Sequence, residues 1–240
     1  MKNIKVVAFD ADDTLWVNEP YFREAEHNFC ILMSRFGTEG EIAAKLFKIE
    51  MKNLPLYGYG AKAFTLSLLE TALELWKDAP VLQKRTDIQP ITPAEMERVI
   101  KIGTSLLSIP MDLLDGVEGV LKELSGKYRL VVATKGDLLD QQKKLERSGL
   151  LPYFHHVEIM SDKKEEDYTR LIGNLDVDAG SFMMVGNSLK SDVLPVLALG
   201  GYAVYVPFYT TWAHEEVDGE VKHSHFYEIA TAGELLKILG

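Results

Sequence analysis

Three acidic residues and a threonine follow the first apolar run of the chain. Asp10, Asp12, Asp13 and Thr14 come directly after Phe9. Two carboxylates two residues apart can divide the work of a hydrolysis. One stays ionised as nucleophile and metal ligand, while the other is protonated and acts as general acid. Close like charges raise one pKa, so a carboxyl group here can keep its proton near neutral pH. These residues could also form only a turn and a helix cap, but three acids after an apolar strand favour chemistry.

A hydroxyl and a lysine follow two later apolar runs. Thr134 is followed by Lys135 and Gly136, and a hydroxyl with free backbone N–H groups at a helix start forms an anion site. Lys135, beside Thr134, could therefore bind an anionic substrate. Lys163 comes three residues after the next apolar run, and taken alone it would be a surface lysine.

Oxygen-bearing side chains follow the run that ends at Val185. Asn187 and Asp192 lie in this segment and could supply oxygen ligands to a hard cation. Loops rich in Asn, Ser and Asp are common without any function. The joint pattern is less common, because acids, a hydroxyl, a lysine and an acid or amide follow successive strands in turn.

The apolar runs that precede these residues predict buried strands of a parallel sheet, since each is short and bounded by turn formers. The predicted strands are 4–9, 128–133, 156–160, 182–185 and 203–206. Helices are predicted between them at 138–148, 165–175 and 191–199. This alternation is typical of right-handed βαβ units, so the sequence predicts an α/β fold with a doubly wound parallel sheet. Ligands of such sheets bind beyond the carboxyl ends of the strands, where the polar residues above are expected.

A long helical stretch interrupts the alternation after the first strand. Apolar residues repeat there with a 3.6-residue period, and the predicted helices are 20–36, 39–52, 61–76 and 93–107. Thr38 and Thr92 mark two helix starts, and the chain at 54–60 predicts a turn. We expect an all-helical domain at residues 17–112, inserted into an α/β core of residues 1–16 and 113–240.

The composition excludes several classes of protein. A chain of 240 residues that is 47% hydrophobic and 26% charged is globular rather than disordered or fibrous. Its formal net charge of −10 argues against a nucleic-acid or membrane-surface partner, because these need clustered basic residues. We find no apolar run long enough for a membrane span, and the first residues predict a strand rather than a signal peptide. With Cys30 as its single cysteine, the chain fits a reducing, cytoplasmic location.

The chain resembles the haloacid dehalogenase-like (HAD) superfamily of hydrolases, whose nucleophile is an aspartate. Four motifs at strand ends carry the resemblance: Asp10-Ala11-Asp12-Asp13-Thr14, then Thr134, then Lys163, then Gly186-Asn187-Ser188 with Asp192. The first motif is specific, and the other three are informative together. The resemblance implies a Rossmann-like core. The helical insert resembles the mobile cap that many members carry after the first motif, and such a cap governs which substrate is admitted.

The resemblance also implies roles for these residues. Asp10 would attack a phosphoryl group, and Asp12 would protonate the leaving alcohol and then take a proton from the attacking water. Thr134 and Lys163 would hold the phosphoryl oxygens. Mg²⁺ would bind the Asp10 carboxylate, the main-chain carbonyl of Asp12 and groups of the fourth motif.

Two positions depart from the usual pattern of the family. The fourth motif commonly reads Gly-Asp, whereas this chain has Asn187, whose amide oxygen can bind Mg²⁺ but carries no charge. Asp192 could compensate, directly or through water. The third motif offers two lysines, of which Lys163 has the family's distance to the strand and Lys164 would start the helix.

The sequence therefore predicts a Mg²⁺-dependent phosphomonoester hydrolase that acts on a small phosphorylated metabolite through an aspartyl-phosphate, as a monomer or a homodimer. Two alternatives stay open. A 2-haloacid dehalogenase needs no metal and usually lacks an acid at the position of Asp12. A regulatory protein that binds a phospho-ligand would bind esters without turnover.

Overall fold

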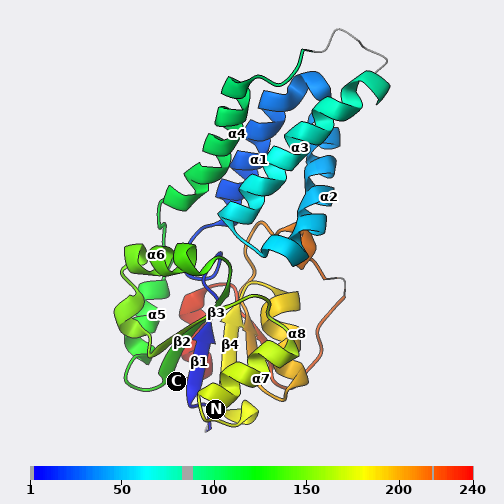
Figure 1. Cartoon of the computed structure of the whole chain (residues 1–240). Helices are drawn as coiled ribbons and strands as arrows, with labels where there is room; N and C mark the ends of the chain where they lie inside the picture. Colours follow the sequence, from blue (N-terminus) through cyan, green and yellow to red (C-terminus); the bar gives the residue numbers. More distant parts are fainter. Residues whose placement is uncertain (1–2, 83–88, 218, 240) are drawn as a thin grey trace. The chain divides into compact units, whose positions relative to one another are not determined.

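The computed structural model describes residues 3–82, 89–217 and 219–239 of the chain. The chain divides into two compact units (Figure 1). The α/β unit contains Met1–Glu19 and Met111–Gly240, and the helical unit contains Pro20–Pro110. None of the described helices is both long and apolar enough to cross a membrane.

The α/β unit is built on a six-stranded sheet. Its strands are β1 (Val6–Phe9), β2 (Arg129–Lys135), β3 (His156–Met160), β4 (Phe182–Gly186), β5 (Tyr202–Tyr205) and β6 (Phe226–Glu228). Their order across the sheet is β3-β2-β1-β4-β5-β6, and neighbouring strands are parallel. The strand order reverses between β1 and β4, and open α/β sheets bind ligands in the crevice at such a switch point. The predicted doubly wound α/β fold is confirmed.

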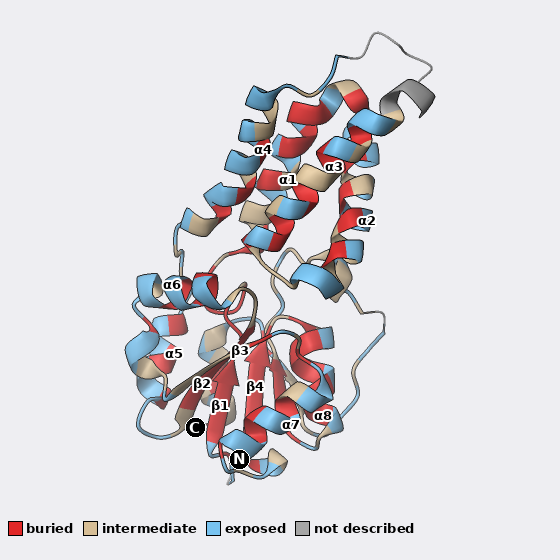
Figure 2. Cartoon of the chain, in the orientation of Figure 1, coloured by how far each residue is buried: buried red, intermediate tan, exposed pale blue. Residues whose placement is uncertain are grey.

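Helices cover both faces of this sheet. They are α5 (Val117–Leu124), α6 (Leu138–Ser148), α7 (Glu165–Asn174), α8 (Leu194–Ala198) and α9 (Leu235–Leu239). Successive residues of a strand point to opposite faces. Val7 and Phe9 therefore join the apolar cluster that includes α5 and α9, while Val6 and Ala8 join the one that includes α7 and α8. All four side chains are buried, as Figure 2 shows for the central strands. The carboxyl ends of the strands are thereby fixed by a core packed on two sides.

Several elements of the α/β unit differ from the prediction, and helices α5 and α9 were not predicted. The segment predicted as one helix at 191–199 begins with a π-helical turn at Leu189–Val193, and its α-helical part is α8. A π-helical turn changes which side chains face inward, and such turns are frequent at functional sites. The edge strand β6 was missed, because three residues are too few to show an alternating pattern.

Four long helices make up most of the described residues of the helical unit. They are α1 (Glu19–Met33), α2 (Glu39–Tyr57), α3 (Ala61–Leu82) and α4 (Pro93–Ser105). Thr38 and Thr92 cap α2 and α4 as predicted, each in a capping box with the glutamate three residues later. The predicted turn at 54–60 is wrong for its first four residues, which continue α2 in spite of Pro55. The helix ends instead at Gly58, whose φ of 72° suits a residue without a side chain.

A glycine allows α4 to approach α3 closely. A Cβ atom at Gly103 would lie 2.1 Å from the hydroxyl oxygen of Thr65, which donates a hydrogen bond to the Ala61 carbonyl. Such a contact can be relieved only by moving the threonine or one of the two helices.

We expect Gly103→Ala to lower the free energy of unfolding by about 1–3 kcal/mol, the usual cost of overpacking. Gly40→Ala is the matched control in the first turn of α2, where a Cβ atom would meet nothing within 4 Å. It should leave stability unchanged or raise it by up to about 1 kcal/mol. Denaturant unfolding followed by circular dichroism measures both variants. Equal effects of the two substitutions would contradict the close approach of α3 and α4.

Candidate active site

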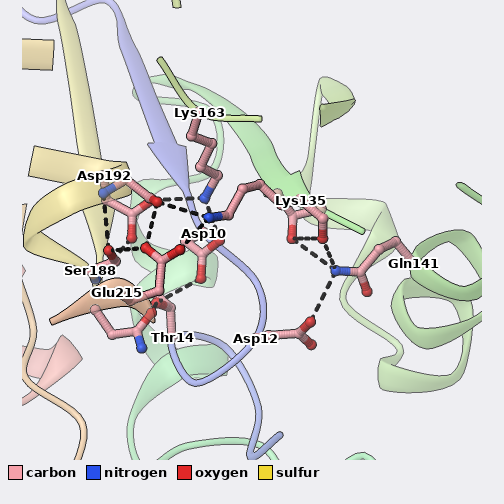
Figure 3. A network of polar contacts seen from close by, with 12 residues as sticks. Asp10, Asp12, Thr14, Lys135, Gln141, Lys163, Ser188, Asp192 and Glu215 are labelled. Atoms are coloured by element: carbon pink, nitrogen blue, oxygen red, sulfur yellow. Dashed lines mark hydrogen bonds and ion pairs between the residues drawn. The ribbon is translucent and has the colours of Figure 1, made fainter. Parts of the chain in front are cut away.

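The first motif lies at the carboxyl end of β1, beside β4 at the switch point of the sheet. Asp10 directly follows β1, and its N–H donates to the Val185 carbonyl of β4 over 2.9 Å. Figure 3 shows side chains from the ends of several strands gathered around Asp10. The parallel register thus brings together residues that are far apart in the sequence.

Asp10, Lys163 and Asp192 form a buried ion-pair cluster. The Lys163 ammonium contacts Asp10 Oδ1 and lies 2.7 Å from Asp192 Oδ1. The Lys163 and Asp192 side chains are each 1% exposed. Burial raises the pKa of Asp10 to about 7; Lys163 opposes this rise, and Asp192 adds to it. Burial works to lower the pKa of Lys163, but the two carboxylates outweigh it and raise that pKa to about 12. Two carboxylates therefore share one lysine cation.

The structure separates the two lysines of the third motif. Lys164 has a side chain that is 74% exposed, and its ammonium pairs with Asp162 at 2.9 Å. Lys163 is the lysine that reaches Asp10, and Lys164 precedes the first residue of α7.

Asp192 is fixed by the chain around it. Its Oδ2 accepts the Ser188 N–H at 3.0 Å, and its Oδ1 faces Lys163. Gly186 is required here, because a Cβ atom at that position would lie 2.2 Å from Asp192 Oδ2. This side chain, predicted as a metal ligand, thus has both oxygens engaged with donors.

Oxygen atoms converge next to Asp10 Oδ2. The end of the Asn187 side chain lies 3.3 Å from Asp10 Oδ2, 3.3 Å from the main-chain carbonyl oxygen of Asp12 and 3.1 Å from Thr14 Oγ1. If the amide nitrogen occupies this position, Asn187 donates to these oxygens. If the amide oxygen occupies it, unprotonated oxygens of three residues face one another.

This arrangement fits a magnesium ion. Mg²⁺ takes octahedral oxygen ligands at about 2.0–2.1 Å, which places neighbouring ligand oxygens about 3 Å apart. In the described part of the chain, no three His, Cys, Asp or Glu side chains gather as a metal site. A cation here would therefore be held by one carboxylate, from Asp10, and by neutral oxygens of Asp12 and Asn187.

The Asp12 carboxylate has partners of its own. It accepts hydrogen bonds from Trp16 Nε1 at 2.8 Å, Lys144 Nζ at 3.0 Å and Gln141 Nε2 at 3.0 Å. Figure 3 shows it directed toward Gln141. Its side chain is 25% exposed, more than that of Asp10. The two predicted catalytic acids thus contact different cations.

The third acid of the motif, Asp13, holds the start of α1. Its carboxylate accepts the backbone N–H groups of Asn18 at 2.8 Å and Glu19 at 3.0 Å. Burial raises the pKa of Asp13 to about 8 in spite of these bonds. The cap role that the sequence left open for this motif belongs to Asp13.

Thr134 and Gly136 both contact Gln141. The buried Thr134 hydroxyl accepts a hydrogen bond from Gln141 Nε2 at 2.9 Å. Gly136 has a φ of 137°, and a Cβ atom there would lie 3.0 Å from Gln141 Cγ. Gly136 therefore makes room for Gln141, a packing role that the predicted anion site did not include.

Lys135 is directed to a carboxylate that the sequence analysis did not single out. Its ammonium lies 2.6 Å from Glu215 Oε1 and 2.8 Å from Ser191 Oγ. Glu215 also accepts hydrogen bonds from the hydroxyls of Ser188 and Ser191, at 2.6 and 2.5 Å. Burial works to raise the pKa of Glu215, but Lys135 and these bonds outweigh it and lower the pKa to about 2. The lysine predicted to bind substrate is thus engaged with Glu215.

Sequence analysis missed Gln141, Lys144 and Glu215. Gln141 and Lys144 lie three residues apart on one face of the predicted helix 138–148, where burial calls for apolar residues. Two polar residues on the inward face are a signal that could have been found. Glu215 ends a 3₁₀ turn of three residues, Ala213–Glu215, and no spacing marks it.

The chain matches the model of the haloacid dehalogenase-like hydrolase family over residues 4–200. It belongs to this family. The protein is therefore a hydrolase with a Rossmann-like core, and the resemblance stated from the four motifs is confirmed.

Solved structures and curated proteins agree with this assignment. A haloacid dehalogenase-like family hydrolase from Xanthomonas campestris is 34% identical, covers 99% of this chain and 91% of its own, and has a TM-score of 0.84. The HAD-hydrolase YfnB from Bacillus subtilis, bound to magnesium, is 18% identical with a TM-score of 0.63 over 99% of both chains, which shows the fold alone. The N-acylneuraminate-9-phosphatase of Mus musculus is 33% identical over 88 residues, or 35% of this chain. The match spans about a third of that protein's length, 36%.

The low pKa of Glu215 makes stability depend on pH. Because its folded pKa lies below the ordinary 4.5, ionised Glu215 stabilises the fold above that range, and this contribution is lost as pH falls toward 2. We expect Glu215→Gln to lower the free energy of unfolding by about 1–3 kcal/mol at pH 7 and by progressively less below pH 4.5. Unfolding curves across this range measure the difference. Glu216→Gln, at an exposed neighbour, should have no effect, and a loss that is the same at every pH would argue against the ion pair.

Proposed function

We propose that this protein is a Mg²⁺-dependent phosphomonoester hydrolase that acts on a small phosphorylated metabolite. The observation that carries the proposal is the separation of the two acids: Asp10 is buried against Lys163, while Asp12 is more exposed and has its own donors. Two carboxylates that contact different groups can take the two different roles, nucleophile and proton carrier, that this reaction needs. Dehalogenation of a 2-haloacid releases halide without a proton and has no use for the second acid.

The reaction follows from these positions in two steps. Asp10 attacks phosphorus and forms an aspartyl-phosphate as the bond to the leaving oxygen breaks, and Asp12 gives that oxygen its proton. Asp12 then takes a proton from the water that attacks phosphorus, which frees the Asp10 carboxylate and inorganic phosphate. Lys163 and Thr134 hold the phosphoryl oxygens during both steps. Each step returns Asp12 to the protonation state that the other requires.

In the orientation that points its amide oxygen at Asp10 and at the Asp12 carbonyl, Asn187 completes a set of three oxygens that supports a magnesium site in this mechanism. When bound, Mg²⁺ supplies positive charge that offsets the charge of the phosphoryl group. Asp192 belongs to the site through Lys163, which it holds beside Asp10, rather than as a direct ligand.

The similarity to the mouse N-acylneuraminate-9-phosphatase supports a phosphorylated sugar derivative as substrate. Sugar acid phosphates, N-acylneuraminate 9-phosphate among them, therefore belong in the substrate panel beside simple sugar phosphates.

Asp10→Asn should lower phosphate release by about 10³-fold or more, since it removes the nucleophile. Release of inorganic phosphate from the panel, with Mg²⁺ and with a chelator, is the measurement. The chelator should stop the wild type as well. Halide release from a 2-haloacid without metal would contradict this proposal and indicate a dehalogenase. Tight binding of esters without turnover would replace it by a regulatory role.

Asn187→Asp tests the magnesium site. A carboxylate in place of the amide adds a charge to the ligand set, so half-maximal activity should need about tenfold less Mg²⁺. The variant should also be less stable than wild type without the ion, because the new charge lies next to Asp10. Thermal unfolding with and without Mg²⁺ gives this second reading, and an unchanged Mg²⁺ requirement would place the ion elsewhere.

A further inference from the structure

Helix α6 carries a buried lysine that the proposed reaction does not use. Lys144 is 3% exposed, and its ammonium lies 3.0 and 3.2 Å from the two carboxylate oxygens of Asp12 and 2.8 Å from Asn18 Oδ1. Asp140 of the same helix is farther away, at 4.0 Å. Asp12 is therefore the main carboxylate partner of the Lys144 ammonium.

Gln141, one turn earlier on α6, contacts the same carboxylate. It is 4% exposed, and its Nε2 lies 3.0 Å from Asp12 Oδ2, 2.9 Å from Thr134 Oγ1 and 2.7 Å from the Lys135 carbonyl. Three acceptors compete for two N–H hydrogens, while its Oε1 is buried without a partner. An amide that only filled space could have placed both of its ends on partners. Gln141 instead leaves its Oε1 without a partner, while its Nε2 contacts Asp12 and Thr134.

The fold alone does not require this pair. Burying an ammonium costs free energy that its partners only partly return, and an apolar side chain of similar volume packs an inward helix position as well or better. The polar residues at 141 and 144 share one partner, the Asp12 carboxylate, which Trp16 contacts from its own loop. Because both side chains contact the Asp12 carboxylate, we look for one role that involves both of them.

We propose that Gln141 and Lys144 are positioning residues that orient the Asp12 carboxylate for proton transfer to the leaving oxygen. Gln141 also joins this acid to Thr134, the hydroxyl that holds the phosphoryl group. The inference rests on the proposed function, in which the Asp12 proton moves to the leaving oxygen as the phosphorus–oxygen bond breaks. It adds two residues of α6 to the parts that this step needs.

Leaving-group dependence separates positioning from structural support. An alkyl phosphate needs the proton because an alkoxide leaves poorly, whereas 4-nitrophenyl phosphate releases a stable phenolate without it. In Lys144→Met and Gln141→Leu, kcat for the alkyl ester should fall by about 10²-fold, and kcat for the aryl ester by less than about threefold. Gln141→Leu exchanges one neutral side chain for another and leaves no unpaired charge. It therefore still tests the proposal if Lys144→Met folds poorly. Lys143→Met and Gln142→Leu, at exposed neighbouring positions, are the matched controls.

A spectroscopic reading tests the contact without turnover. Trp16 Nε1 donates to Asp12 Oδ1, so its indole N–H resonance should shift in Lys144→Met and Gln141→Leu but not in the controls. The chain has three tryptophans, and Trp16→Phe identifies the signal. An unshifted indole resonance would overturn the orientation of Asp12 by α6. Equal losses of kcat for the alkyl and aryl esters would overturn the proposal that these residues orient Asp12 for proton transfer to the leaving oxygen. A wild type that releases no phosphate while the resonance shifts would overturn the proposed function and leave the contact purely structural.

Discussion

The buried Lys163 ammonium, shared between Asp10 and Asp192, fixes the geometry on which the active site depends. A lysine that is 1% exposed must keep acceptors around its charge, because an unpaired buried charge is costly. Its two acceptors come from different strand ends, so the pairing ties the end of β1 to the segment after β4. The absent side chain of Gly186 gives Asp192 the space to reach this lysine. Asp10 can then present its other oxygen on the side where Asn187 lies.

The charge balance of this cluster explains what else gathers around it. Asp10 and Asp192 together carry one negative charge more than Lys163 can balance, and burial makes that excess unfavourable, as the raised pKa of Asp10 shows. A second cation relieves the excess, and neutral oxygen atoms can complete its ligands without adding negative charge beside Asp10. The amide of Asn187 and the main-chain carbonyl of Asp12 are such groups. An amide in place of the family's usual acid is therefore consistent with an Asp10 whose carboxylate is already crowded by Asp192.

The residues of the site that were predicted share one property: each lies at the carboxyl end of a strand or a few residues beyond it. Parallel strands bring their carboxyl ends to one edge, so Asp10, Thr134 and Lys163 could be placed together from the order of the apolar runs. Spacing to the strand also distinguished Lys163 from its exposed neighbour, and burial agrees. The π-helical turn could not be foreseen, because the apolar residues after Ser191 suit an α-helix equally well.

The residues that were missed lie on a helix face or in a short 3₁₀ turn. Glu215 meets Lys135 only through the course of the chain after β5, which no periodicity describes. Gln141 and Lys144 were present in a correctly predicted helix, but polar residues in a helix are assigned by default to its solvent face. Their burial becomes visible only when the helix is docked on the sheet. Sequence patterns locate groups that end strands, whereas groups that orient them from a packed helix emerge from the three-dimensional structure.

The first motif therefore holds two carboxylates in one short loop without making them equivalent. Backbone geometry alone would leave Asp10 and Asp12 similar, since both follow the same strand and lie two residues apart. Their difference comes from outside the loop: Lys163 arrives before α7 and takes one oxygen of Asp10, while α6 supplies Lys144 and Gln141 to Asp12. Each acid has its own cation on a different part of the sheet's edge. A change in one cation thus alters the surroundings of one acid and leaves the other acid's direct contacts in place, and this independence allows one loop to hold two carboxylates in two chemical roles.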